Sequence, residues 1–286
     1  MVALESTVVT HGLPHPENLT LAQEMENIVR KGGGVPATIA VLDGKVRIGL
    51  RNDQLEQLAT VSDARKISVR DFAPALVQQV TGGTTVAATL FAANTAGIGV
   101  FATGGIGGVH RFPAYDVSTD LVLLASTPVI VVCAGAKAIL DLPGTLEYLE
   151  TVGVPVIGYQ TDEFPAFYSR ESGLPVSARA NSPEEVAAIA TTHWKLGLKS
   201  AVLVVAPPPA ETALPKAQVE SVIEQALREA QEQNIRGQAI TPFLLKRVSE
   251  LTGKASLQAN LGLLYNNARI ATQIAGKLSL NSKNLI

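Results

Sequence analysis

The sequence has little cysteine and few aromatic residues. Cys133 is the single cysteine among 286 residues, and Phe, Trp and Tyr make up only 5% of the chain. One cysteine cannot form an internal disulfide, so the chain suits a reducing compartment and we expect a cytoplasmic protein. Hydrophobic residues reach 47%, and Ala, Val, Leu and Gly dominate. This composition is typical of parallel strands covered by helices on both faces.

Neither sign of charge is in excess, since 23 Lys and Arg stand against 25 Asp and Glu. A chain without a basic patch is not expected to bind nucleic acid or an anionic membrane. Residues 72–109 contain no formally charged residue, which is longer than a membrane-spanning helix requires. Pro74, Asn94 and eight glycines within that run argue against a lipid-exposed helix. Glu5 stands where the apolar part of a signal peptide would begin, so we expect no secretion signal.

Strand and helix patterns alternate along the chain, which predicts an α/β fold with a mainly parallel sheet. Functional groups are then expected at the carboxyl ends of the strands. No domain boundary is visible, so we predict one domain over residues 1–286. Strands are predicted within 98–105, 128–135, 154–167 and 200–209; helices within 15–34, 84–97, 119–127, 144–153, 182–197, 215–233, 241–252 and 256–278; and a β-hairpin over 36–50.

Lys137 is the only charged residue between Leu121 and Leu140. The pattern predicts that it begins a helix directly after the strand within 128–135. A cation there opposes the helix dipole, and burial likewise favours the neutral amine. A neutral, desolvated lysine at a strand exit is suited to form a Schiff base. The alternative is a lysine whose stem packs on the protein while its ammonium reaches water.

Two glycine-rich segments follow predicted strands. "ATGGIGGVH" has four glycines within five positions, and "TGGTT" combines glycines with hydroxyl groups. Backbone N–H groups in such segments can approach a phosphate closely. His110 replaces the last glycine of a dinucleotide fingerprint, and no G-x-x-x-x-G-K-[ST] is present. The segments therefore indicate either a sugar-phosphate site or simple tight turns.

Acidic residues give two further candidates. In "YDVSTD", Asp116 could hold a divalent cation together with several waters, while Asp120 or Thr119 caps the next helix. A simple N-cap explains either aspartate alone. Glu5, at the end of a short apolar strand, is either an exposed edge residue or a buried proton carrier.

Histidines give weaker signals. His11 and His15 are four residues apart, but the intervening Gly12 and Pro14 prevent a helical metal-binding face.

The chain resembles the pseudouridine-5′-phosphate glycosidases, also called the indigoidine synthase A-like family. The resemblance runs nearly end to end and depends on "ALEST", "HGLPHPEN", "GGTTVAAT", "VFATGGIGGVHR", "VVCAGAKAILD" and "TPFLL". It implies a three-layer α/β/α sandwich, decorated by the β-hairpin and C-terminal helices, and a homotrimer. The implied reaction is reversible cleavage of pseudouridine 5′-phosphate to uracil and ribose 5-phosphate. A departing carbon has no lone pair to protonate, so an amine that holds the sugar C1′ as an imine suits this chemistry.

The resemblance also implies roles for individual residues. It makes Lys137 the Schiff-base nucleophile, Glu5 the proton donor, and Asp116 the ligand of one largely water-coordinated Mn²⁺. Implied substrate contacts are Lys66, Val86, Ser118, Thr119 and Asp120, and His110 and Asn260 are candidate pocket residues. The chain departs from the family in "RFPAYD", which is shorter than usual and contains Pro113, and in a nearly absent leader before "ALEST".

Two alternatives stay beside this hypothesis. Another imine-forming lyase or aldolase on a phosphorylated sugar would share Lys137 and the phosphate-binding segments without needing a uracil pocket. A sugar-phosphate binding protein without turnover would bind ligand while Lys137 stayed protonated and inert.

Overall fold

A computed structural model describes residues 1–112 and 116–283 of the chain. In this part, a single large sheet has the strand order β11-β10-β12-β8-β6-β1-β2-β5-β4, and β3 pairs with β2 beside this path. Its strands are β1 (Val2–Leu4), β2 (Pro36–Leu42), β3 (Lys45–Ile48), β4 (Arg65–Ile67), β5 (Gly82–Thr84), β6 (Val100–Ala102), β8 (Ile130–Cys133), β10 (Val156–Tyr159), β11 (Ala178–Ala180) and β12 (Val202–Val205).

The sheet is mainly parallel, as the alternation of elements predicts. Antiparallel pairs are confined to β2, which pairs in that sense with β3 and β5. At the centre, Leu4 of β1 is opposite Ala102 of β6, and Ala102 is opposite Val132 of β8. The carboxyl ends of these three strands are therefore in register. Residues that follow them come out at the same edge of the sheet.

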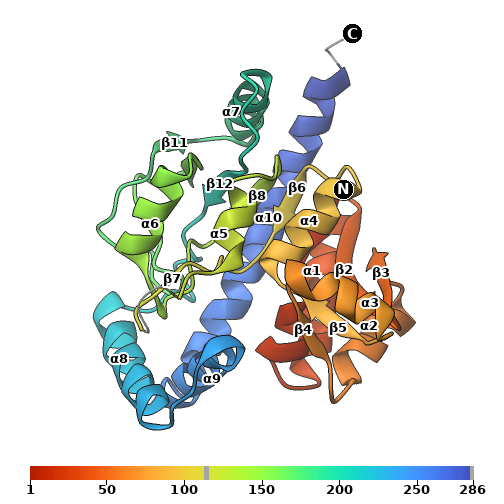
Figure 1. The fold of residues 1–286 in the computed structure, drawn as a ribbon. Coiled ribbons are helices and arrows are strands. Elements are labelled where there is room, and N and C mark those ends of the chain that lie inside the picture. The colour runs from red at the N-terminus through yellow and green to blue at the C-terminus, as the bar shows by residue number, and fades with distance from the viewer. Residues whose placement is uncertain (113–115, 284–286) are drawn as a thin grey trace.

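Helices cover both faces of the sheet, so the predicted three-layer α/β/α architecture is confirmed. Right-handed crossovers from β1 to β2 and from β6 to β8 run in opposite directions along the sheet, which places α1 and α5 on opposite faces. Helices α7 and α10 join α1, while α4 packs against α5. Figure 1 shows α10 running behind the sheet. The helices are α1 (Glu17–Lys31), α2 (Asn52–Thr60), α3 (Phe72–Val77), α4 (Val86–Thr95), α5 (Thr119–Leu124), α6 (Leu142–Thr151), α7 (Pro183–Lys195), α8 (Lys216–Glu232), α9 (Ile240–Leu251) and α10 (Ala255–Lys283).

The core lies between the sheet and these helices. The strand residues Val2, Ile130 and Val204 are fully buried, as is Leu263 of α10. Each fully buried side chain of this size contributes roughly 1.5–3 kcal/mol through removal of apolar surface from water. Helix α4 is rich in alanine, and its small side chains let it lie close to both the sheet and α5. No helix within the described ranges combines the length and apolar character needed to cross a bilayer.

The β-hairpin is formed as predicted, with Asp43 and Gly44 between β2 and β3. Both residues have positive φ angles, 48° and 69°, as a type I′ turn requires. The segment "TGGTT" is different from the prediction, because Gly82–Thr84 forms strand β5 rather than an open loop. A Cβ atom on Gly82 would collide with the Arg65 carbonyl group. Close approach of neighbouring strands therefore explains this glycine.

The predicted helix start at Lys137 is wrong. Helix α6 begins at Leu142, five residues later. Ala136 instead forms a bridge with Ile106, and β9 (Leu140–Asp141) pairs with β7 (Val109–His110). Lys137 lies between these pairings, at the start of a turn in which the Leu140 N–H donates a hydrogen bond of 3.0 Å to the Lys137 carbonyl oxygen. The helix dipole thus has no part in the environment of its amino group.

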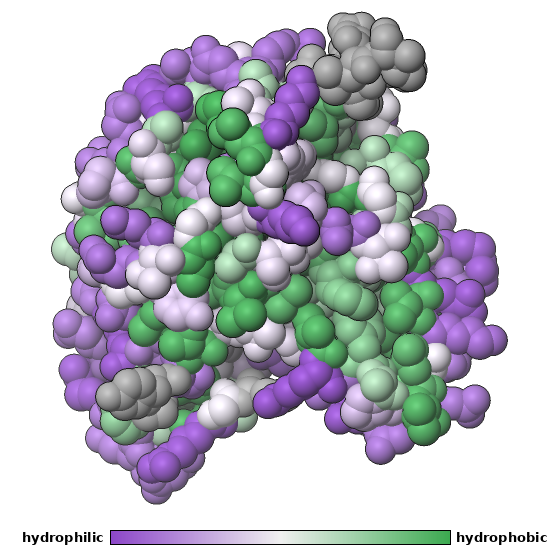
Figure 2. Space-filling model, turned by 45° about the horizontal axis from the view of Figure 1, so that its top comes forward, coloured by the Kyte–Doolittle hydropathy of each residue, from purple (hydrophilic) through white to green (hydrophobic). Residues whose placement is uncertain are grey.

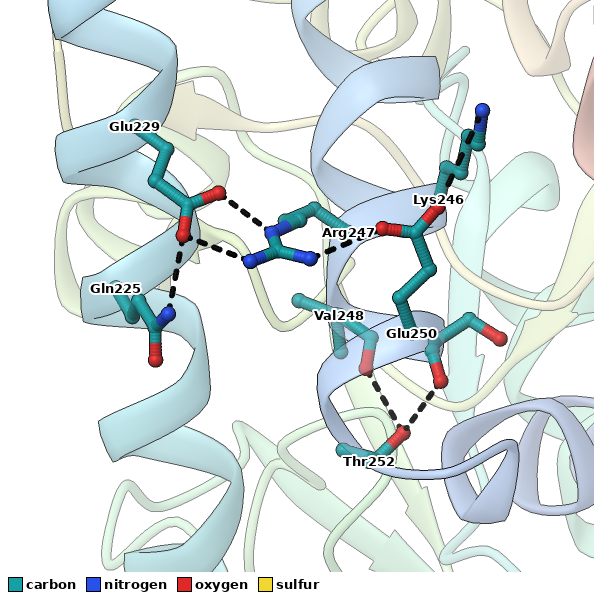
Figure 3. Close-up of polar contacts among 8 residues, drawn as sticks. Gln225, Glu229, Lys246, Arg247, Val248, Glu250 and Thr252 are labelled. Carbon is teal, nitrogen blue, oxygen red and sulfur yellow. Dashed lines mark hydrogen bonds and ion pairs between the residues drawn. The ribbon is translucent and has the colours of Figure 1, made fainter.

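The helices α8 and α9 form a hairpin at one end of the molecule (Figure 1). Arg247 of α9 joins them, because its Nε atom is 2.5 Å from Glu229 Oε2 of α8 (Figure 3). Its Nη1 atom also lies 3.1 Å from Oε2 of Glu250 on its own helix. Gln225 Nε2 donates a further hydrogen bond of 3.0 Å to Glu229. Arg247 therefore fixes α9 against α8, while Lys246 and Glu250 line a cavity.

Candidate active site

The ten predicted site residues all line one cavity of about 960 Å³. Most of them follow the carboxyl ends of strands, and α9 and α10 contribute further wall residues. This shared location was not obvious from the sequence, because the residues come from segments up to 255 positions apart. Their individual roles stay predictions. The ten are Glu5, Lys66, Val86, His110, Asp116, Ser118, Thr119, Asp120, Lys137 and Asn260.

Glu5 follows β1 and receives a hydrogen bond from the hydroxyl group of Thr103, which follows β6. Asn267 of α10 fixes Thr103 in turn, because its Nδ2 atom donates to the Thr103 carbonyl oxygen at 2.9 Å. Burial raises the pKa of Glu5, and this effect outweighs the opposing influences of Lys137 and the Thr103 hydrogen bond. Glu5 therefore keeps a proton at a higher pH than an ordinary glutamate, as a proton donor requires.

Lys137 is half-buried at the cavity wall. Its Nζ atom donates a hydrogen bond of 2.6 Å to the Gly105 carbonyl oxygen, and its backbone N–H donates to Ile106 at 3.1 Å. The glycine-rich segment after β6 thus holds both ends of this lysine. Cys133, four residues earlier, is buried in β8, and burial raises the pKa of its thiol to about 12. The thiol therefore stays protonated at neutral pH and does not compete with Lys137 as a nucleophile.

Lys66 of β4 brings a second amino group to the cavity. Burial lowers its pKa, and repulsion from Lys137 lowers it further, while Asp120 and Glu5 act in the opposite direction. Two amino groups and two carboxyl groups thus interact across one cavity. Clefts that hold groups with shifted pKa values, here Glu5 and Lys66, are typical of active sites.

Asp120 is almost fully buried and ties two segments of the wall together. Its Oδ1 atom accepts a hydrogen bond of 2.8 Å from the Ala87 N–H, and its Oδ2 atom accepts one of 2.7 Å from the Gly107 N–H. The cap of α5 is Ser118, whose Oγ atom accepts from the Asp120 N–H at 3.2 Å. The prediction that Asp120 or Thr119 supplies this cap is wrong, because the Asp120 carboxylate is already occupied.

Val86, the first residue of α4, leaves its N–H group available to a ligand. The neighbouring N–H groups are taken: Thr85 donates to Ile67, Ala87 to Asp120 and Ala88 to the Thr85 hydroxyl. Within the described part of the chain, the Val86 N–H has no hydrogen-bond acceptor. A substrate oxygen could therefore bind to the Val86 main chain regardless of its side chain.

His110 and Asp116 both line the cavity and are joined by a hydrogen bond of 2.9 Å from the His110 N–H to the Asp116 carbonyl oxygen. Burial lowers the pKa of His110, although Asp116 counteracts this shift. No three His, Cys, Asp or Glu side chains among the described residues form a metal-binding group. Asp116 therefore fits only a cation bound largely through water. Pro113 of the shortened segment lies outside the described residues.

His11 also lines this cavity. Its one pattern in the sequence is its spacing from His15, and His15 is exposed and does not line the cavity. Thr7 and Thr10 are further polar wall residues that belong to no predicted site, and Thr85, the last residue of the segment "TGGTT", also lines the cavity. The block "HGLPHPEN" was the one signal that could have pointed to His11.

Comparison with known proteins decides the family. The family described as "Indigoidine synthase A like protein" matches residues 1–277. The chain belongs to this family. It is 53% identical over 281 residues to the pseudouridine-5′-phosphate glycosidase of Caldanaerobacter subterraneus. The matched region covers 98% of this chain and 92% of that relative. The enzyme of the same name from Geobacillus kaustophilus is 54% identical, and the matched region covers 98% of this chain and 93% of that enzyme.

Solved structures of the indigoidine synthase A-like family share the fold. An indigoidine synthase A-like protein from Thermotoga maritima has a TM-score of 0.91 and 38% identity, covering 97% of this chain and 92% of its own. The prealnumycin C-glycosynthase AlnA, solved in complex with ribulose 5-phosphate, also has a TM-score of 0.91, with 39% identity and coverages of 99% and 93%.

Proposed function

We propose that the protein is a pseudouridine-5′-phosphate glycosidase, which reversibly cleaves the C–C glycosidic bond to give uracil and ribose 5-phosphate. The observation that carries this proposal is the position of Glu5 and Lys137. They follow the two strands that flank β6 and face one cavity, in a chain more than half identical to glycosidases of this name. The lower identity to a C-glycosynthase favours the glycosidase activity over transfer to another acceptor.

In the first step, the Lys137 nitrogen, once it has lost its extra proton, forms a bond to the sugar C1′ as the C1′–O4′ bond breaks, and a proton passes from the nitrogen to O4′. The sugar ring is then open and held covalently. The Gly105 carbonyl oxygen accepts a hydrogen bond of 2.6 Å from Lys137 Nζ. This bond occupies one N–H of the amine and can thereby orient the lone pair of the nitrogen. Binding of the remote phosphate would hold C1′ against this nitrogen, so that binding energy supports orientation.

In the second step, Glu5 gives its proton to C5 of uracil. The C1′–C5 bond then breaks, its electron pair returns to the uracil ring, and the Lys137 lone pair forms an iminium with C1′. Water adds to the iminium, the amine leaves, and ribose 5-phosphate is released. The raised pKa of Glu5 keeps the required proton available, and Thr103 orients the carboxyl group.

Borohydride reduction with ribose 5-phosphate, followed by peptide mass mapping, tests the covalent step. The expected product is a reduced sugar-phosphate adduct on Lys137, absent from Lys137→Arg. Failure of the wild-type protein to form any adduct would favour a binding protein without turnover. Incubation with ribose 5-phosphate and uracil separates glycosidase from aldolase, because only the glycosidase forms pseudouridine 5′-phosphate.

One Mn²⁺ ion belongs to this proposal, with Asp116 as its protein ligand. The carboxylate borders the cavity, and hard cations accept one carboxylate and several waters. A bound divalent ion would neutralise negative charge on substrate oxygens. Asp116→Ala should abolish the dependence of turnover on added Mn²⁺; an unchanged response would remove this assignment.

We further propose a cytoplasmic homotrimer. The single, buried cysteine suits a reducing compartment. Exposed apolar side chains on β3, α3 and α4 support association: Ile48 is 38% exposed, Val77 84% and Phe91 46%. Figure 2 shows apolar side chains along its right side, where Figure 1 places these elements. Light scattering after gel filtration should give a mass three times that of one chain. Val77→Asp should lower this measured mass.

A further inference from the structure

A π-helical turn, η1 (Val8–Gly12), directly follows the Glu5 segment. Turns of this kind are rare and occur frequently at functional sites. This one is held firmly, because Val9 is buried and its carbonyl oxygen accepts a hydrogen bond of 2.9 Å from Asn18 Nδ2. The turn presents His11 to the same cavity that Glu5 lines.

The ring of His11 has a defined orientation. Its Nδ1 atom is 2.7 Å from Thr10 Oγ1. The other contacts of that hydroxyl, to the carbonyl oxygens of Ser6 and Thr7, are longer at 3.4 and 3.5 Å. The hydroxyl proton is therefore assigned to the Nδ1 contact, so that the hydrogen of the neutral ring is on Nε2. Among the described residues, Nε2 has no hydrogen-bond partner.

Charges around His11 favour this neutral donor. Charged side chains that line the cavity from elements packed against the π-helical turn are Glu17 of α1, Lys66 of β4, and Lys246 and Glu250 of α9. Burial lowers the pKa of His11, and Lys66 lowers it further. Lys66 itself is half-buried and forms no ion pair within the described part of the chain. His11 and Lys66 thus both present donors to the same cavity.

We propose that His11 and Lys66 form the phosphate-binding pair of this active site, with His11 Nε2–H donating to a phosphate oxygen and Lys66 supplying the charge. The ligand class is a sugar phosphate monoester, and the assignment rests on the proposed function. The available Val86 N–H, which lines the same cavity, gives a third donor. His11 then selects phosphorylated over unphosphorylated sugars, which Lys137 alone would not distinguish.

Calorimetric titration with ribose 5-phosphate tests the pair directly. His11→Phe keeps a ring but loses the donor, so its affinity should fall roughly tenfold to hundredfold, as for loss of a hydrogen bond to a charged group. His11→Gln retains an N–H donor and should recover part of the loss. His15→Gln, at an exposed histidine of the same segment, should bind as the wild type does. Equal affinity of His11→Phe and wild type would overturn the proposal.

A second readout separates ligand binding from a structural role. In NMR titrations, ribose 5-phosphate should raise the pKa of His11, because an adjacent anion favours the imidazolium form, whereas ribose should leave it unchanged. Absence of this difference would also overturn the proposal. Uracil release from pseudouridine 5′-phosphate by the wild type tests the glycosidase function separately. A protein that binds ribose 5-phosphate through His11 but releases no uracil would refute that function alone.

Discussion

Replacing Asp120 with alanine should destabilise the protein far more than its single negative charge implies. The substitution leaves the buried N–H group of Ala87 and the half-buried N–H group of Gly107 without the acceptors that now lie 2.8 and 2.7 Å away. An unsatisfied buried N–H costs about 1–3 kcal/mol and the half-buried one costs at most as much, so the expected loss is about 1–6 kcal/mol. That is a large part of the roughly 5–15 kcal/mol that stabilises a typical domain. Asp120→Asn keeps one acceptor and should lose about half as much.

Urea denaturation followed by circular dichroism measures this loss as a change in the free energy of unfolding. Asp63→Asn is a matched control, because Asp63 is exposed, and its effect should stay within about 0.5 kcal/mol. In thermal scans, Asp120→Ala should lower Tm by at least about 2 °C. If Asp120→Ala costs less than about 1 kcal/mol, the two N–H groups do not depend on this carboxylate, and its role in joining the walls of the cavity is refuted.

Three further experiments have expected outcomes. Because burial raises the pKa of Glu5, its stabilising contribution is full below the ordinary value and disappears as pH rises through the raised one. Glu5→Gln should therefore raise Tm at pH 7 but not near pH 4, while turnover falls roughly 10²–10⁴-fold. Gly83→Ala should cost about 1–3 kcal/mol in urea, since its Cβ would meet Thr10 and the Ser6 carbonyl. A double-mutant cycle for Arg111 and Glu220 should give a coupling below about 1 kcal/mol that weakens with salt.

The sequence predicted the layers because the signals of strands and helices are local, whereas most of the site residues are implied by the family resemblance and their roles stay predictions. Strands such as Ile130–Cys133 are short apolar runs between turn residues, and the hairpin turn at Asp43-Gly44 is a strong dipeptide signal. The choice of Glu5 and Lys137 came from chemistry at strand ends, supported by the family resemblance. Parallel topology then brings such residues to one edge of the sheet.

The failures involve contacts between distant parts of the chain. "AKAILD" has helical composition, but pairing of Ala136 with Ile106 overrides that propensity and delays the helix to Leu142. His11 was missed because its relevant neighbour, Lys66, is 55 residues away and a single strand pattern does not reveal that proximity. Gly83 belongs to a segment with the composition of a loop, but a glycine is needed there because Thr10 and the Ser6 carbonyl group leave no room for a Cβ atom.

The burial of Cys133 has a practical consequence for spectroscopy. Its thiol is fully buried within β8 and stays protonated far above neutral pH, so maleimide reagents should not modify it in the folded protein. A cysteine introduced at an exposed position of α8 would then carry the sole fluorophore without removal of the native one. Emission from that dye would report directly whether the α8–α9 hairpin moves when a sugar phosphate enters.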